Sequence, residues 1–121
     1  MSFPFEKLIV YQKALEWVRE TEGLVKESRG LVSRPMLDQL CRASLSVPLN
    51  IAEGNGRWHK ADKRQFFWVA RGSVFECVPI LQSLRALNAI DEIRFRAGYR
   101  LLEEIARMHT GLIQSVEKLE T

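Results

Sequence analysis

Hydrophobic residues recur along this chain every three or four positions, which is the spacing of an amphipathic helix and not of a strand. Strict alternation of apolar and polar residues is missing, and the Asn-Gly pair at 55–56 lies between two helical patterns. Four helical segments are expected, at residues 6–26, 35–54, 60–87 and 91–119. Because the segments are long and the connections short, the pattern predicts an all-α fold, an antiparallel up-down-up-down four-helix bundle that forms one domain over residues 1–121.

Prolines and glycines refine this expectation. Pro48 and Pro79 fall inside predicted helices, where each removes a backbone N–H and crowds the preceding turn, so we expect two kinks. Gly54 and Gly56 suit the left-handed conformation that ends many helices, so the second helix should stop there. Asp91 is a plausible N-cap for the fourth helix.

A line of polar residues runs along one face of the second helix. Its members step by 4, 4, 3 and 4 positions: Arg42, Ser46, Asn50, Glu53 and Arg57. A solvated face is one interpretation. We favour a satisfied polar seam between helices or subunits, with Arg71 or Glu76 of the third helix as candidate partners, because buried Asn and Glu would each lose about 1–3 kcal/mol if unpartnered.

The third helix carries Gly72-Ser73 at its middle, after Phe66-Phe67-Trp68 and before Glu76. A mid-helix glycine costs about 1 kcal/mol relative to alanine, so the close approach of another helix should offset that cost. A tolerated surface glycine is the alternative. Together these two helices supply the expected structural or interface residues: Arg42, Asn50, Glu53, Gly54, Gly72, Ser73 and Glu76.

Charge is distributed unevenly along the chain. The 121 residues carry a formal net charge of +3, and the segment 42–71 holds six Lys or Arg against two acids. Its loop mixes cations with Trp58 and His59, a combination that can neutralise phosphates and stack on a base. A solvated loop is about equally compatible with this composition. The candidate nucleic-acid-binding residues are Arg57, Lys60, Lys63, Arg64 and Arg71.

No catalytic, metal-binding or cofactor-binding pattern is present in the sequence. Glu-x-x-His pairs, Cys-x-x-Cys, phosphate loops and nucleophile motifs are missing, and His109 falls on the apolar stripe of the fourth helix. Cys41 and Cys77 occupy apolar helix positions, which favours two buried thiols in a reducing compartment. Neither a signal peptide nor a membrane span is recognisable, so we expect a cytoplasmic protein without catalytic residues, metal or cofactor.

Three motifs together resemble the small four-helix-bundle family encoded in intervening sequences of bacterial large-subunit (23S) ribosomal RNA genes. This family includes relatives of the accessory proteins of diversity-generating retroelements. The resemblance spans nearly the whole chain and rests on residues 5–14, on residues 42–54 continued through Gly56-Arg57, and on a third-helix set: Phe67, Ala70, Gly72, Ser73 and Glu76.

The resemblance implies a homo-oligomer, commonly a homopentameric ring, with no known catalytic activity. It also implies binding of nucleic acid, and of a reverse transcriptase, through basic surfaces. This chain departs from that picture in one respect, because its positive excess is confined to one segment. The leading hypothesis is a non-enzymatic homo-oligomer that binds RNA or DNA through residues 57–71. The alternative is a protein-interaction scaffold with no direct nucleic-acid role.

Overall fold

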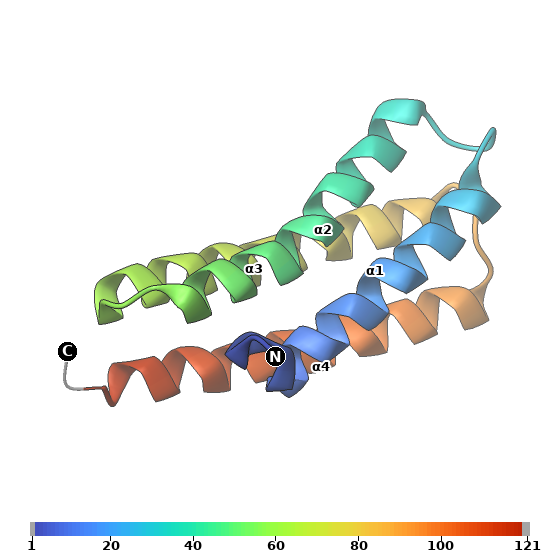
Figure 1. Cartoon of the computed structure of the whole chain (residues 1–121). Coiled ribbons are helices and arrows are strands. Elements are labelled where there is room, and N and C mark those ends of the chain that lie inside the picture. Colours follow the sequence, from blue (N-terminus) through green and yellow to red (C-terminus); the bar gives the residue numbers. More distant parts are fainter. Residues whose placement is uncertain (1, 120–121) are drawn as a thin grey trace.

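Four α-helices make up most of residues 2–119, the part of the chain that the computed structural model describes (Figure 1). They are α1 (Ile9–Ser28), α2 (Arg34–Gly56), α3 (Lys60–Ala86) and α4 (Glu92–Glu117), and a short 3-10 helix, η1 (Pro4–Lys7), precedes them. Consecutive helices run antiparallel, and each packs against its two neighbours around the ring α1–α2–α3–α4. The predicted four-helix bundle is confirmed.

The helix boundaries follow local side-chain chemistry. Ser33 caps α2 by accepting a hydrogen bond from the Met36 backbone N–H, and Asp91 caps α4 by accepting one from the Arg94 backbone N–H at 2.8 Å. The predicted N-cap Asp91 is therefore confirmed. The largest difference from the expected bounds is at α1, which begins at Ile9 because the preceding residues form η1.

The core is built from the inward stripes of all four helices. Trp17, Leu40, Val47, Leu81 and Ile105 are among its fully or almost fully buried side chains. Burial of such side chains is the main favourable term in folding. None of the described helices combines the length and the apolar composition that a membrane crossing requires.

One end of the bundle has three helices instead of four. Lys13 of α1 pairs with Glu104 of α4 at 3.4 Å, which sets how the two helices align. Only four residues of α1 precede Lys13, whereas thirteen residues of α4 follow Glu104. Beyond α1, therefore, α2, α3 and α4 pack together, and Phe67, Ile113 and Val116 form a second apolar cluster. Four of the five predicted basic residues lie at this end: Arg57, Lys60, Lys63 and Arg64.

Both predicted proline positions lie inside continuous helices. Figure 1 shows α2 changing direction partway along its length, as expected from Pro48, which cannot donate to the Ser44 carbonyl.

The prediction that two glycines end the second helix was wrong in its mechanism. The helix continues through both glycines to Gly56, and neither has a positive φ. Gly54 serves close packing instead, because a Cβ at this position would lie 2.7 Å from Cε1 of Phe67.

Candidate nucleic-acid interface

Four predicted cations gather where α2 turns into α3. Arg57 directly follows α2, and Lys60, Lys63 and Arg64 lie in the first turns of α3. Because neighbouring helices are antiparallel, the start of α3 lies beside the C-terminal ends of α2 and α4 (Figure 1). Such ends expose free carbonyl groups and carry partial negative charge, so they attract cations even without a ligand.

The two lysines use this proximity. Lys60 Nζ donates to the Glu117 backbone oxygen at 2.9 Å, and Lys63 Nζ donates to the Asn55 backbone oxygen at 2.8 Å. Both side chains therefore cap helix C-termini, which is a structural role. An ammonium group has three N–H donors, so each lysine keeps donors for a further acceptor.

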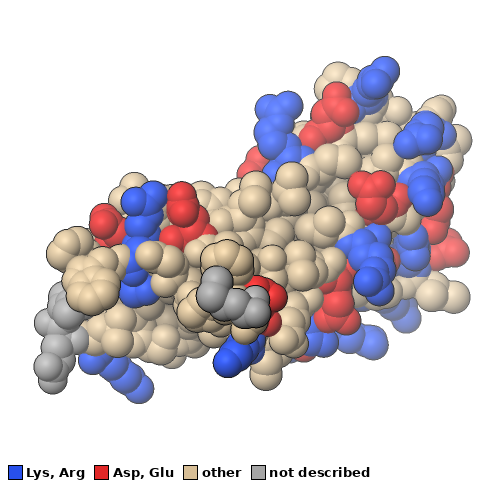
Figure 2. Space-filling view, viewed as in Figure 1, with Lys and Arg blue, Asp and Glu red and all other residues tan. Residues whose placement is uncertain are grey.

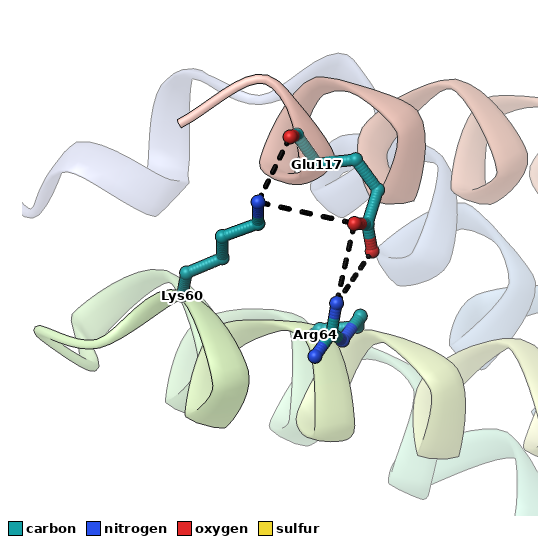
Figure 3. A network of polar contacts seen from close by, with 3 residues as sticks. All are labelled: Lys60, Arg64 and Glu117. Carbon is teal, nitrogen blue, oxygen red and sulfur yellow. Dashed lines mark hydrogen bonds and ion pairs between the residues drawn. The ribbon is translucent and has the colours of Figure 1, made fainter. Parts of the chain in front are cut away.

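Glu117 links α4 to the start of α3 (Figure 3). Arg64 Nη1 donates to both carboxylate oxygens, at 3.0 and 3.2 Å, and Lys60 Nζ lies 4.0 Å from Oε2. Two cations thus share one acid. Partly exposed ion pairs of this kind contribute about 0–1 kcal/mol, so a phosphate group can compete with Glu117 for them.

Arg57 is also engaged within the chain. Its Nη2 lies 3.3 Å from Glu53 Oε1, and its guanidinium carbon is 4.7 Å from the centre of the Phe66 ring. The four cations of this corner are accompanied by three acids (Glu53, Asp62 and Glu117), so these seven residues together carry a single surplus positive charge. Figure 2 likewise shows Lys and Arg interspersed with Asp and Glu on the face it displays, with no large area of one sign.

Arg71 lies apart from this corner. Its guanidinium carbon is 4.3 Å from the Phe75 ring centre and 5.5 Å from that of Trp68, so it rests on the aromatic residues of its own helix. Its Nε is buried and has no hydrogen-bond partner among residues 2–119. The structure therefore brings together four of the five predicted binding cations.

Only the middle of the predicted polar seam is shielded within one chain. Asn50 Nδ2 donates to the Ser46 carbonyl at 2.8 Å and to the Ser46 hydroxyl at 3.0 Å, and the Ser73 hydroxyl donates to Ser46 Oγ at 2.8 Å. Arg42, Glu53 and Arg57 are exposed. Ser46 and Ser73 thus join α2 to α3.

The partners expected for the seam were wrong. Asn50 bonds within its own helix and Glu53 pairs with Arg57, whereas the suggested partners are engaged elsewhere. Arg71 rests on aromatic rings, and the Glu76 carboxylate accepts a hydrogen bond from the Gln39 side chain.

The outer face of α3 is a feature that the sequence reasoning missed. From residue 65 to 86, the most exposed residues of α3 other than Glu76 are uncharged. Two partly exposed cations flank them: Arg71, which rests on Trp68 and Phe75, and Arg85, whose side chain is 41% exposed. Trp68 and Phe75 are each 51% exposed there, and a Cβ on Gly72 would meet nothing within 4 Å. We refer to these residues as the α3 face: Gln65, Trp68, Val69, Gly72, Phe75, Pro79, Gln82 and Ala86.

The expected close approach of a helix to Gly72 is therefore not made within residues 2–119. The spacing of Trp68, Gly72, Phe75 and Pro79, by 4, 3 and 4 positions, was the signal in the sequence that could have revealed an uncharged stripe. Beside it, a hollow of about 260 Å³ lies between α3 and α4 and is lined by Phe75, Val78, Pro79 and Tyr99 among others.

The buried polar groups serve the core. Ser44 Oγ accepts hydrogen bonds from Trp17 Nε1 at 2.9 Å and from the Thr21 hydroxyl at 2.8 Å, and it lies 3.7 Å from Cys77 Sγ. Burial raises the pKa of the Cys77 thiol to about 11, so it stays protonated. Cys41 is only partly buried, unlike the expectation of two buried thiols.

His109 is fully buried on α4. Its Nδ1 donates to the Ile105 carbonyl at 3.1 Å, and its Nε2 has no partner among residues 2–119. Burial lowers the pKa of His109; the hydrogen bond to Ile105 opposes this shift, and the positive charge of Arg71 adds to it. The described residues contain no group of three His, Cys, Asp or Glu side chains placed to hold a metal ion.

Comparison with known proteins places this bundle in a family. The chain resembles, in fold, a crystal structure of a protein of unknown function from the S23 ribosomal protein family of Bacteroides thetaiotaomicron. The TM-score is 0.80 at 22% sequence identity, over 86% of this chain and 97% of that chain. No curated protein matches this chain in sequence. The family model of the 23S rRNA-intervening sequence proteins matches residues 6–111, and the chain therefore belongs to that family.

Proposed function

We propose that this protein is a non-enzymatic homo-oligomeric bundle that assembles through the α3 face and binds nucleic acid, RNA or DNA, through the basic corner of Arg57, Lys60, Lys63 and Arg64. The observation that carries the proposal is the exposed α3 face, on which the Arg71 guanidinium rests against the rings of Trp68 and Phe75. Most solvated helix faces carry many charges, whereas this one exposes two large aromatic side chains.

Self-association explains the composition of the α3 face. A second copy would cover Trp68 and Phe75, and the missing Cβ of Gly72 would let another backbone approach closely. A patch that pairs with itself gives a two-fold dimer, whereas a ring, such as the pentamer expected from the family resemblance, requires the α3 face of one subunit to contact a different surface of the next.

Assembly also bears on nucleic-acid binding. A single surplus charge per corner gives weak attraction to a phosphate backbone. Repetition of that corner around a ring places several weak sites on one particle, and the later contacts become intramolecular. Affinity is then a property of the oligomer.

The test compares variants that remove positive charge from the basic corner with one that removes the acid paired to its cations. Arg57→Gln/Arg64→Gln removes two cations and leaves the lysine caps intact, so affinity for an RNA or DNA oligonucleotide should fall. The salt dependence should flatten by about one log unit per log salt for each phosphate that the variant no longer neutralises. Glu117→Gln should instead tighten binding, because it frees Arg64 and Lys60.

The matched control is Arg19→Gln/Arg100→Gln, which removes the same charge from exposed positions on α1 and α4. Gel-shift or anisotropy titrations over a range of salt concentrations provide the measurement. If the corner variant binds as tightly as this control, the basic corner is not the binding surface.

The alternative function is a protein-interaction scaffold, which the α3 face also favours because the same uncharged residues fit a different polypeptide. A reverse transcriptase is the partner that the family resemblance suggests. The absorbance ratio of the purified protein separates the two functions: bound nucleic acid supports the first, whereas clean protein that captures a defined polypeptide supports the second.

A further inference from the structure

A hollow of about 560 Å³ lies beside the basic corner, between the N-terminal segment and the end of α2. Small-molecule sites commonly have volumes in this range. Three aromatic side chains and two cations are among the groups that line it: Phe3, Phe5, Trp58, Arg57 and Lys63. No acid of the described chain lines it, although Glu53 pairs with the lining residue Arg57 at 3.3 Å.

The N-terminal wall is held in place by its own contacts. The Phe3 ring stacks on Phe5 with centroids 5.7 Å apart, and the rings of Phe5 and Tyr11 pack edge-to-face with centroids 4.9 Å apart. The Phe3 backbone N–H donates to Glu6 Oε1 at 2.8 Å, which closes the turn of η1. Phe3 is nevertheless 58% exposed, so this wall offers a fixed aromatic surface to a ligand.

The opposite wall comes from the α2–α3 turn. Trp58 is 82% exposed, so its indole contributes little to folding, and it stands beside two cations that keep hydrogen-bonding capacity. Lys63 uses one of its three N–H donors on Asn55. Arg57 has five N–H donors, and its Nη2 donates to Glu53 Oε1, so the donors of its other nitrogens remain for a ligand.

From this arrangement we infer that the hollow receives an unpaired nucleobase of a single-stranded nucleic acid, which stacks on Trp58 and contacts Phe3 on the opposite wall, while the adjoining phosphate meets Arg57 and Lys63. The inference rests on the proposed function and deepens it by naming the class of strand. A base in a duplex has both faces stacked and cannot enter. Proteins hold single strands by stacking the bases on aromatic side chains beside cations, and this applies to both RNA and DNA.

The experiment measures anisotropy of dye-labelled oligouridine, oligothymidine and a duplex of equal length, with the full chain. Both single strands should bind more tightly than the duplex. Trp58→Leu and, independently, Phe3→Leu should weaken single-strand binding by about 5- to 100-fold, as expected when one base–aromatic stack is removed, and leave duplex binding unchanged. Trp58→Phe should keep most of the affinity because it keeps an aromatic face.

Leu31→Ala is the matched control, since Leu31 is 62% exposed at the other end of the bundle, in the loop between α1 and α2. Circular dichroism confirms that each variant remains helical. If the unmodified chain binds the duplex as tightly as the single strands, and Trp58→Leu behaves like Leu31→Ala, the hollow is not a base site although the basic corner still binds phosphate. If the unmodified chain binds neither kind of strand, the proposed function falls together with this inference.

Discussion

Gly54 and Gly111 lie inside helices and have opposite surroundings. A Cβ on Gly54 would lie 2.7 and 2.9 Å from two ring carbons of Phe67 and 3.0 Å from Cβ of Phe66, whereas a Cβ on Gly111 would meet nothing within 4 Å. The missing side chain at Gly54 therefore allows α3 to pack closely against α2. At Gly111 the missing side chain serves no contact among the residues that the structure describes.

Alanine substitutions at Gly54 and Gly111 should therefore change the free energy of unfolding in opposite directions. Gly54→Ala should lower the free energy of unfolding by about 1–3 kcal/mol, because the new methyl group overpacks the contact with Phe67. Gly111→Ala should raise it by up to about 1 kcal/mol through helix propensity. Chemical denaturation measures both, and two shifts of the same sign would contradict this account of Gly54.

At the scale of the elements, one hydroxyl group ties three helices together. Ser44 of α2 accepts hydrogen bonds from Trp17 and Thr21 of α1 and contacts Cys77 of α3, and all four side chains are buried. Such a satisfied polar group fixes the relative register of the helices, because any sliding leaves the buried indole N–H unpaired.

Ser44→Ala should therefore lower the free energy of unfolding by about 1–3 kcal/mol, since it leaves Trp17 Nε1 buried without an acceptor. Ser83→Ala is the matched control, because among residues 2–119 the Ser83 hydroxyl donates only to the carbonyl of Pro79 on the same helix. Its effect should stay within about 0.5 kcal/mol. Equal effects of the two substitutions in urea titrations would show that the network contributes nothing specific.

The whole molecule places two surfaces close together on α3. The basic corner occupies the first turns of that helix, and Trp68 of the α3 face lies only one turn after Arg64. Contacts between copies at the α3 face would therefore bring the corners of neighbouring subunits near one another, which is the arrangement that multivalent binding requires.

Disruption of the α3 face should thus prevent self-association and, in the same variants, weaken nucleic-acid binding. Phe75→Glu and, separately, Trp68→Glu should convert the oligomer to monomers, because each places a charge inside the contact, and nucleic-acid affinity should fall in the same variants. Size-exclusion chromatography with light scattering gives the mass.

The control for this pair is Ile93→Glu on α4, at a side chain 82% exposed, which should change neither property. If the unmodified chain is already a monomer, or if Phe75→Glu and Trp68→Glu keep the mass of the oligomer, the α3 face is not the assembly surface.

Several structural details follow from local sequence and were predictable. Asp91 caps α4 because a carboxylate before an amphipathic run accepts the first free N–H groups. Pro48 lies inside a helix that continues because the inward stripe from Leu37 to Ile51 runs through it. The seam partners of Asn50 were not predictable, since a side chain that can bond to its own helix needs no neighbour.

The sequence by itself therefore determined the number, order and inward faces of the helices, because a period of 3.6 residues is a local property of the chain. Only the tertiary structure decided what Lys60, Lys63 and Trp68 do. Their roles depend on which helix ends and faces come near them. Lys60 meets Glu117, which lies 57 residues away, and no local pattern carries that information.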